Sequence, residues 1–219
     1  MRFSKTFTMI LGVCLLLLFI GAGLAVTLSC RSLYTSGIEE WRLDEISGLS
    51  RETIVRNYDV MMDWTSPFHR ESLKLPDLTL SPSAAQHFAE CKPLFDFFLI
   101  AGAVSLPVCV WLMVRFIRAK RWGNIATAGI ISLAIPVVFV LPALIDFDML
   151  FVIFHKIFFN NDMWLFDPAV DPVINILPEA YFMRCALLMG GIITAGGLLV
   201  TAAGALMRLR ERESAKRNA

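Results

Sequence analysis

Two of the three histidines in this sequence stand beside long apolar stretches, where an ionisable group is unusual. His87 comes just before one stretch and His155 just after another, next to Phe88 and Phe154. An imidazole titrates near neutral pH, so two of them can serve as general base and general acid. Ionisable groups at the edge of an apolar layer are costly and tend to be functional. We therefore take His87 and His155 as the candidate catalytic residues.

The spacing of Cys, His and acidic residues gives less support to a cysteine nucleophile or a metal site. Cys91 lies four residues after His87, as a nucleophile and its base would on one helix, but a buried thiol is usually inert. His87, Glu90 and His155 lack a further ligand at helical spacing, so we expect no metal. The chain has no GxSxG or HExxH motif, no HxxxxD pattern and no CxxC pair. We expect no cofactor either.

The composition is that of a membrane protein. Of 219 residues, 57% are apolar and 18% are charged, too few charges to cover a water-soluble domain. The net charge of +1 excludes a nucleic-acid binder, which would present a basic face. Four stretches reach the roughly 20 residues that a bilayer requires. The predicted spans are approximately 7–28, 95–114, 125–145 and 185–207, within a single membrane domain, 1–219.

The distribution of basic residues predicts that both termini are cytoplasmic. Short loops rich in Lys and Arg stay inside the cell. The first span is too long in its apolar core for a signal peptide, and no A-x-A site follows it. Segments 29–94 and 146–184 are therefore predicted to lie outside, where Cys30 and Cys91 could form a disulfide. The basic residues are Arg2, Lys5, Arg115, Arg118, Lys120, Arg121, Arg208, Arg210, Arg212, Lys216 and Arg217.

The first outer segment has helical patterns that bring His87 close to the membrane surface. Ser50 is a plausible N-cap, and apolar residues recur at helical spacing over Ser50–Trp64. Residues 65–80 are predicted to be irregular or to form short strands. A helix should begin at Pro82 and run through His87 into the second span, with a bend near Pro93.

The second outer segment is crowded with aromatic residues. An aromatic belt at the headgroups accounts for two or three of them, but not for His155, Asp167 and Asp171 in their midst. Turns are predicted at 160–162 and 167–168, and a short helix from Pro172 to Leu177. The fold predicted overall is an all-α membrane protein, a four-helix transmembrane bundle with a small extracellular cap.

Three blocks of sequence stand out: Asn57-Tyr58, HFAECKPLF at 87–95 and FHKIFFNNDMWLFDP at 154–168, followed by Asp171 and Leu177-Pro178. Together they resemble the lipoprotein intramolecular transacylase (Lit) family, over nearly the whole chain. The middle block departs from the HF-x-D-V-K pattern associated with that family. Glu90 replaces Asp, Cys91 replaces Val and Pro93 is unexpected, while His87 and Lys92 are in place.

The resemblance implies an acyltransferase of the bacterial cell membrane that forms lyso-form lipoproteins. Its substrate would be a lipoprotein whose N-terminal cysteine carries a diacylglyceryl thioether and a free α-amine. The sn-2 acyl chain moves to that amine, at the outer face of the membrane. The implied partners are such lipoproteins and the lipid bilayer, with no nucleic acid, and the oligomeric state is left open.

The residue inventory suits that reaction. An intramolecular transfer needs no enzyme nucleophile. It needs an α-amine, whose pKa is about 8, in its neutral form, and a leaving glyceryl oxygen that becomes protonated. We expect His87 to be the base and His155 to be the acid or the group that stabilises the oxyanion.

The remaining candidates would bind the substrate or support the histidines. A confined aromatic pocket would orient the flexible lipid, and its expected lining is Tyr58, Phe88, Phe154, Phe158 and Trp164. Asn57 or Lys92 would donate hydrogen bonds to the ester or the peptide. Glu90, Asp167 and Asp171 are expected to cap helices or to orient a histidine.

Two alternatives remain open at this stage. One is a hydrolase or intermolecular acyltransferase that uses Cys91 with His87. The other is a non-enzymatic membrane assembly or sensing protein whose histidines respond to pH.

Overall fold

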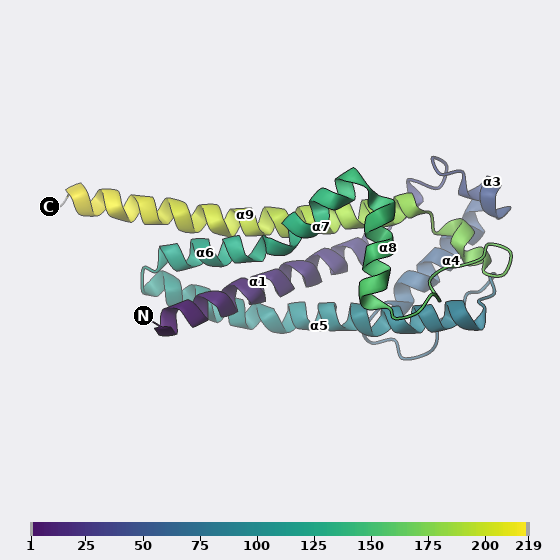
Figure 1. Cartoon of the computed structure of the whole chain (residues 1–219), viewed down its shortest axis with the longest axis horizontal. Helices are drawn as coiled ribbons and strands as arrows, with labels where there is room; N and C mark the ends of the chain where they lie inside the picture. The colour runs from purple at the N-terminus through teal and green to yellow at the C-terminus, as the bar shows by residue number, and fades with distance from the viewer. Residues whose placement is uncertain (1, 218–219) are drawn as a thin grey trace. The chain divides into compact units, whose positions relative to one another are not determined.

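The computed structural model describes residues 2–217, with the side chains of residues 2–4, 135–137 and 139–141 left out. All regular elements in this range are helices (Figure 1), so the short strands allowed for at 65–80 do not form. The elements are α1 (Arg2–Ser29), α2 (Ser32–Thr35), α3 (Leu43–Ser47), α4 (Arg51–Trp64), α5 (Pro82–Arg118), α6 (Trp122–Ser132), α7 (Ala134–Ile145), α8 (Phe147–Phe158), the 3-10 helix η1 (Pro172–Ile176) and α9 (Glu179–Arg217).

The chain divides into two compact units, which we describe separately. Unit 1 comprises Met1–Gly23, Phe98–Leu141 and Met189–Ala219. Unit 2 comprises Leu24–Phe97 and Pro142–Leu188. Because α1, α5 and α9 are long, each contributes to both units. All the candidate site residues belong to unit 2.

Unit 1 is built from apolar helices that pack closely. Leu11 of α1, Leu112 of α5 and Ile125 of α6 belong to one buried cluster. Glycines allow the backbones to approach: a Cβ at Gly204 of α9 would lie 2.5 Å from the backbone nitrogen of Ala126. Since real Cβ atoms do not come that close, the absence of a side chain at Gly204 allows α9 to pack against the backbone of α6.

Three helices are long and apolar enough to cross a membrane within the described residues: Lys5–Ser29, Pro82–Arg118 and Glu179–Arg217. They contain the predicted first, second and fourth spans. The predicted third span, 125–145, is instead divided between α6 and α7, which are separated at Leu133. Pro136 lacks the amide hydrogen that would bond the carbonyl of Ser132, which explains the interruption. That this pair of shorter helices crosses the membrane stays a prediction.

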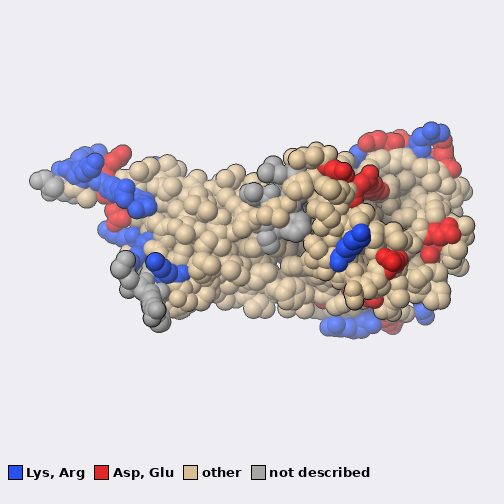
Figure 2. Space-filling view, in the orientation of Figure 1, with Lys and Arg blue, Asp and Glu red and all other residues tan. Residues whose placement is uncertain are grey.

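Charge is segregated in unit 1. Figure 2 shows Lys and Arg gathered at the end that carries the last turns of α9 and the turn between α5 and α6, whereas the rest of the visible face of this unit is uncharged. Exposed apolar side chains such as Val104, Val110 and Leu199 cover the helices elsewhere. An apolar surface with a basic end is the pattern of a membrane-embedded bundle.

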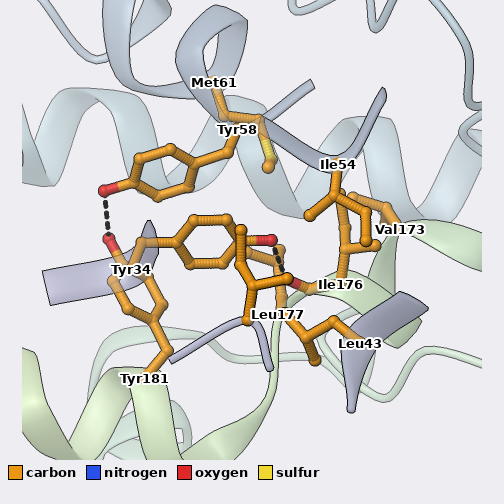
Figure 3. Close-up of a cluster of buried hydrophobic side chains, with 10 residues drawn as sticks. Tyr34, Leu43, Ile54, Tyr58, Met61, Val173, Ile176, Leu177 and Tyr181 are labelled. Atoms are coloured by element: carbon orange, nitrogen blue, oxygen red, sulfur yellow. Dashed lines mark hydrogen bonds between the residues drawn. The ribbon is translucent and has the colours of Figure 1, made fainter. Parts of the chain in front are cut away.

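Unit 2 has its own core, built around three tyrosines (Figure 3). Tyr34 and Tyr58 stack with ring centroids 3.9 Å apart, and the hydroxyls of Tyr58 and Tyr181 lie 3.1 Å apart. The Tyr34 hydroxyl donates to the Ile176 carbonyl at 2.7 Å, which joins α2 to η1. Aliphatic side chains from α3, α4 and η1 complete this core.

The predicted helix starts in unit 2 are confirmed. Ser50 caps α4 by accepting a hydrogen bond from the Thr53 amide at 3.2 Å, and α5 begins at Pro82. Helix α5 continues without interruption through Pro93, where a bend is predicted. All five cysteines are free, so the disulfide allowed for between Cys30 and Cys91 does not form.

Candidate active site

The two candidate catalytic histidines come together in unit 2. His87 lies on the second turn of α5 and His155 on the last turn of α8. Their ring centroids are 5.7 Å apart, and the ring planes are inclined by 35°. Both side chains are more than nine-tenths buried, with exposed fractions of 8% and 7%. Residues 68 positions apart in the sequence therefore form one site.

Helix α8 positions His155. Asp146 caps this helix by accepting a hydrogen bond from the Met149 amide at 2.9 Å. One turn before His155, the carbonyl oxygen of Phe151 accepts a hydrogen bond from Nδ1 of the imidazole at 2.7 Å. A carbonyl can only accept, so Nδ1 carries a proton. In the neutral ring, Nε2 is then left with a free lone pair.

Aromatic rings enclose His155. The indole of Trp164 stacks on it with a centroid distance of 4.6 Å, and Phe151 lies at 4.2 Å. Phe154 meets it edge-on at 5.4 Å. This burial lowers the pKa of His155 below its usual value, and the hydrogen bond to Phe151 offsets part of the shift. His155 is therefore neutral at physiological pH.

His87 has a different environment. Phe159 and Phe166 pack edge-on against its ring at 4.8 and 5.7 Å. Its Nε2 lies 3.5 Å from the sulfur of Cys91. Its Nδ1 is buried and has no hydrogen-bond partner among the described residues. A buried polar nitrogen without a partner is costly, which makes Nδ1 a natural place for a substrate atom.

A chain of hydrogen bonds connects α5 to the ring that covers His155. The side-chain amide of Asn161 donates to both oxygens of Glu90, at 3.0 and 3.3 Å. The Asn161 carbonyl accepts from the indole nitrogen of Trp164 at 3.1 Å. Glu90 also accepts from Gln86 at 3.1 Å. Glu90 therefore holds the turn after α8 and, through it, Trp164.

Lys92 forms an ion pair with Asp96 one turn along α5. Both side chains are largely buried, with exposed fractions of 13% and 18%. Sequence analysis missed Asp96, although a Lys and an Asp four residues apart on a helix are suitably spaced to pair. The charge of Lys92 is thus already partnered in the absence of substrate.

The expected pocket residues divide into two groups. Phe154 and Trp164 contact His155, and Phe158, which is 42% exposed, packs against Phe154. Phe88 contacts Trp64 and Phe166 and packs against the tyrosine core. The structure brings all four into the aromatic shell around the histidines or directly beside it.

Asn57 and Tyr58 lie instead in the interior of the cap. The Asn57 amide donates to the Thr53 carbonyl and to Asp77, each at 2.8 Å, and its oxygen accepts from the Asp77 amide at 3.3 Å. Tyr58 is 1% exposed within the tyrosine core. Neither has a polar group free for a substrate, so both hold the cap together.

The two aspartates stabilise backbone rather than a histidine. Asp167 accepts a hydrogen bond from the Ala169 amide at 2.9 Å and forms the expected turn. Asp171 does not cap η1 as its position suggested. It is 3% exposed and accepts hydrogen bonds from both the amide and the hydroxyl of Ser81, the residue before α5. Asp171 thereby anchors the start of the helix that carries His87.

Several residues of the site were missed from the sequence: Phe151, Phe159, Phe166, Asn161 and Asp96. The helix α8 was missed as well, although Asp146 with aromatic residues at three- and four-residue intervals is a helical signal. Within residues 2–217, no group of three His, Cys, Asp or Glu side chains could hold a metal ion together. The site thus offers two neutral imidazoles inside an apolar, aromatic shell, which is an arrangement for proton transfer.

Comparison with known proteins shows the family to which the chain belongs. The family model described as "Lipoprotein intramolecular transacylase Lit" matches residues 9–182. No curated protein sequence matches the chain. A solved structure of the membrane integral lipoprotein intramolecular transacylase Lit from Bacillus cereus superposes with a TM-score of 0.89 at 25% identity, covering 97% of this chain and 99% of that one.

Two variants of the Bacillus cereus enzyme, in which a histidine is replaced by arginine or alanine, give TM-scores of 0.83 at 25% identity. They cover 97% of this chain and 95% and 96% of theirs. The resemblance found in the sequence is thereby confirmed. The chain belongs to the lipoprotein intramolecular transacylase (Lit) family and is a membrane-integral acyltransferase.

Proposed function

We propose that the chain transfers the sn-2 acyl group of a diacylglyceryl lipoprotein to the α-amine of its N-terminal cysteine, with His87 and His155 as acid–base catalysts. The observation that carries this proposal is the buried pair itself. Two imidazoles with centroids 5.7 Å apart, one with an unpartnered nitrogen and one with a free lone pair, suit a reaction that moves one proton.

In the proposed reaction, the amine nitrogen attacks the carbonyl carbon of the sn-2 ester. The new C–N bond forms, and the bond from the carbonyl carbon to the glyceryl oxygen breaks. The nitrogen loses a proton and the glyceryl oxygen gains one. The product is an N-acyl, 2-lyso lipopeptide with the same mass as the substrate, so no water and no second lipid is consumed.

From the sequence, His87 was expected to be the base and His155 the acid. The hydrogen bond at His155 supports the opposite assignment. Because Nδ1 of His155 donates to Phe151, the neutral ring can accept a proton at Nε2 without a change of tautomer. We therefore assign the base role to His155. His87 then passes the proton from His155 on to the glyceryl oxygen, with its buried Nδ1 as the nitrogen in contact with substrate, so that both imidazoles end the reaction neutral.

The aromatic shell supports a second part of the mechanism, which is orientation. The lipid must fold so that its own amine meets its own ester, and correct orientation is worth about 7–11 kcal/mol in favourable cases. We assign Phe88, Phe154, Phe158 and Trp164 to substrate contact. Lys92 would reach the ester only by leaving Asp96, and Asn57, Tyr58, Asp167 and Asp171 act by holding the cap.

The orientation in the membrane is part of the proposal. We infer cytoplasmic termini and an outer active site, because the basic residues gather at the ends of unit 1 that carry the α5–α6 turn and the tail. Lipoproteins that carry a diacylglyceryl group are then presented to unit 2 from the outer leaflet.

A second candidate function rests on one contact. Cys91 lies 3.5 Å from Nε2 of His87, which is the geometry of a thiol and its base. A thioester mechanism would pass the acyl chain through Cys91, to water or to another molecule. Replacing Cys91 by Ala abolishes that pathway and leaves a direct transfer intact.

Mass spectrometry of one reporter lipoprotein tests the proposal. The chain is produced in a bacterium that lacks N-acylation, and the N-terminal lipopeptide is analysed by fragmentation. An unchanged total mass, with one acyl chain now on nitrogen and one fewer on the glyceryl group, is expected. Loss of a chain without N-acylation would support hydrolysis, and an unmodified lipopeptide beside well-expressed protein would contradict both reactions.

A further inference from the structure

In unit 1, the turn between α5 and α6 faces the basic tail of α9 across a cavity of about 500 Å³. None of the residues that line this cavity takes part in the proposed acyl transfer. Four cations line it: Lys120 and Arg121 from the turn, and Arg208 and Arg212 from α9. Glu211 is the one acidic residue in its lining. The cavity is therefore strongly positive, and Figure 2 shows the basic end of unit 1 to which these residues belong.

Little of this charge is neutralised by the protein. Lys120 approaches Glu211 at 4.0 Å, but 74% of its side chain is exposed. The described residues contain no ion pair to Arg121, Arg208 or Arg212. Three guanidinium groups around one cavity repel one another unless an anion lies between them, and guanidinium is the side-chain group best suited to a phosphate.

The backbone adds donors on the same side. Helix α6 begins at Trp122, its N-cap residue Arg121 makes no side-chain capping hydrogen bond, and Trp122 and Gly123 line the cavity. The guanidinium of Arg208 lies against this end: a Cβ at Gly123 would be 3.5 Å from its Nη1. First-turn amides and an arginine that converge at one end of a helix complement a phosphate.

We propose that this cavity is a binding site for a phosphate group, the headgroup phosphate of an anionic phospholipid or a soluble phosphate. Basic pockets between transmembrane helices on the cytoplasmic side are suited to anionic lipid headgroups. The bound phosphate joins the α5–α6 turn to the α9 tail. This site is distinct from the histidine pair, and its location on the cytoplasmic side rests on the proposed orientation.

Native mass spectrometry of the full chain in neutral detergent tests the site. Short-chain phosphatidylglycerol is titrated against short-chain phosphatidylcholine, with inorganic phosphate as a competitor. We expect phosphatidylglycerol to bind at least about tenfold more tightly, because the zwitterionic lipid brings a choline cation beside its phosphate, and the four cations of the cavity repel it. Displacement by millimolar phosphate would identify a soluble phosphate as the ligand, and resistance to it would identify the lipid.

A matched pair of double variants separates the cavity from the general positive charge of the tail. R208Q/R212Q removes two cavity arginines, and R210Q/R217Q removes the same charge from exposed positions on the same helix that do not line the cavity. We expect the first to weaken phosphatidylglycerol binding about tenfold and the second by less than about twofold. Equal losses in the two variants, equal binding of the two lipids or no binding at all would overturn the proposal. Lipid binding is measured independently of acyl transfer. The phosphate site and the proposed acyl-transfer function can therefore be disproved separately.

Discussion

Asp171 and Ser81 are joined by two hydrogen bonds, to the backbone amide at 2.7 Å and to the hydroxyl at 2.9 Å, across 90 residues of sequence. This contact fixes the first turn of the helix that carries His87. Replacing Asp171 by Ala leaves the partly buried amide of Ser81 unsatisfied, and we expect a loss of about 1–3 kcal/mol in the free energy of unfolding. Unfolding in mixed micelles measures it.

Asp167→Ala is the control for that variant. Asp167 is exposed, and among the described residues its side chain bonds within its own turn, to the Ala169 amide. Its loss should cost less than about 1 kcal/mol. Equal effects of the two substitutions would show that the link to Ser81 contributes nothing.

The proposed mechanism predicts that kcat depends strongly on the two histidines and only weakly on the neighbouring thiol of Cys91. His87→Ala and His155→Ala should each lower kcat by about 10²–10⁴-fold, because each removes one partner of the proton transfer. Cys91→Ala should keep kcat within about threefold of the unmodified enzyme. The rate of N-acylation of a synthetic lipopeptide measures all three. A Cys91→Ala variant as inactive as the histidine variants would instead favour the thioester mechanism.

Asn161 and Glu90 should behave as one unit. Either Asn161→Ala or Glu90→Ala frees the turn that holds Trp164 on His155, and we expect kcat to fall about tenfold through misplacement of the site. Because both substitutions break the same contact, the double variant should be hardly worse than either single one. Gln86→Ala is the control, since Gln86 binds the same carboxylate but does not reach the turn. Additive losses would mean that the two residues act separately.

The lowered pKa of His155 predicts how stability depends on pH. As pH falls through about 6.5, the unfolded chain takes up a proton at this histidine while the folded chain stays neutral. Stability that is fully present above pH 6.5 is therefore lost as pH falls toward the folded-state pKa. Chemical unfolding from pH 7.5 down to 5 measures the loss, and His155→Phe should lose less over the same range. A variant that declines as steeply as the unmodified chain would contradict this assignment.

Close helix packing in unit 1 predicts a strong effect at Gly204. A side chain there would meet the backbone of α6, which cannot yield as a flexible side chain would. Gly204→Leu should lower the unfolding midpoint markedly, whereas Gly191→Leu, where a Cβ meets nothing within 4 Å, should be tolerated. Thermal unfolding of the two variants in detergent compares them directly, and equal midpoints would contradict the packing argument.

The sequence was informative wherever the signal is local. Ser50 and Pro82 marked the starts of α4 and α5, because capping and proline placement depend on a few adjacent residues. The histidine pair was found from chemistry and from its position beside two apolar stretches. In contrast, the division of the third apolar stretch into α6 and α7 was not predicted, although Pro136 marks a place where a helical hydrogen bond must be lost.

Long-range partners could not be predicted. The roles of Asp171 and Glu90 depend on Ser81 and Asn161, which are 90 and 71 positions away. The same holds for Asn57, whose side-chain amide donates to Asp77, 20 positions away, as well as to the nearby Thr53 carbonyl. A single sequence gives neither the distance nor the direction between such groups. For Asp171, Glu90 and Asn57, it therefore predicted a general kind of role but not the partner residue.

The stacking of Trp164 on His155 gives the chain an internal optical reporter. A protonated imidazole in contact with an indole quenches its fluorescence, and a neutral one does so far less. Trp164 is one of five tryptophans, and the other four, Trp41, Trp64, Trp111 and Trp122, make no ring contact with either histidine among those described. A chain in which those four are phenylalanine would emit from the active site alone. The charge on His155 would then be measurable as a change in fluorescence intensity, before any substrate is added.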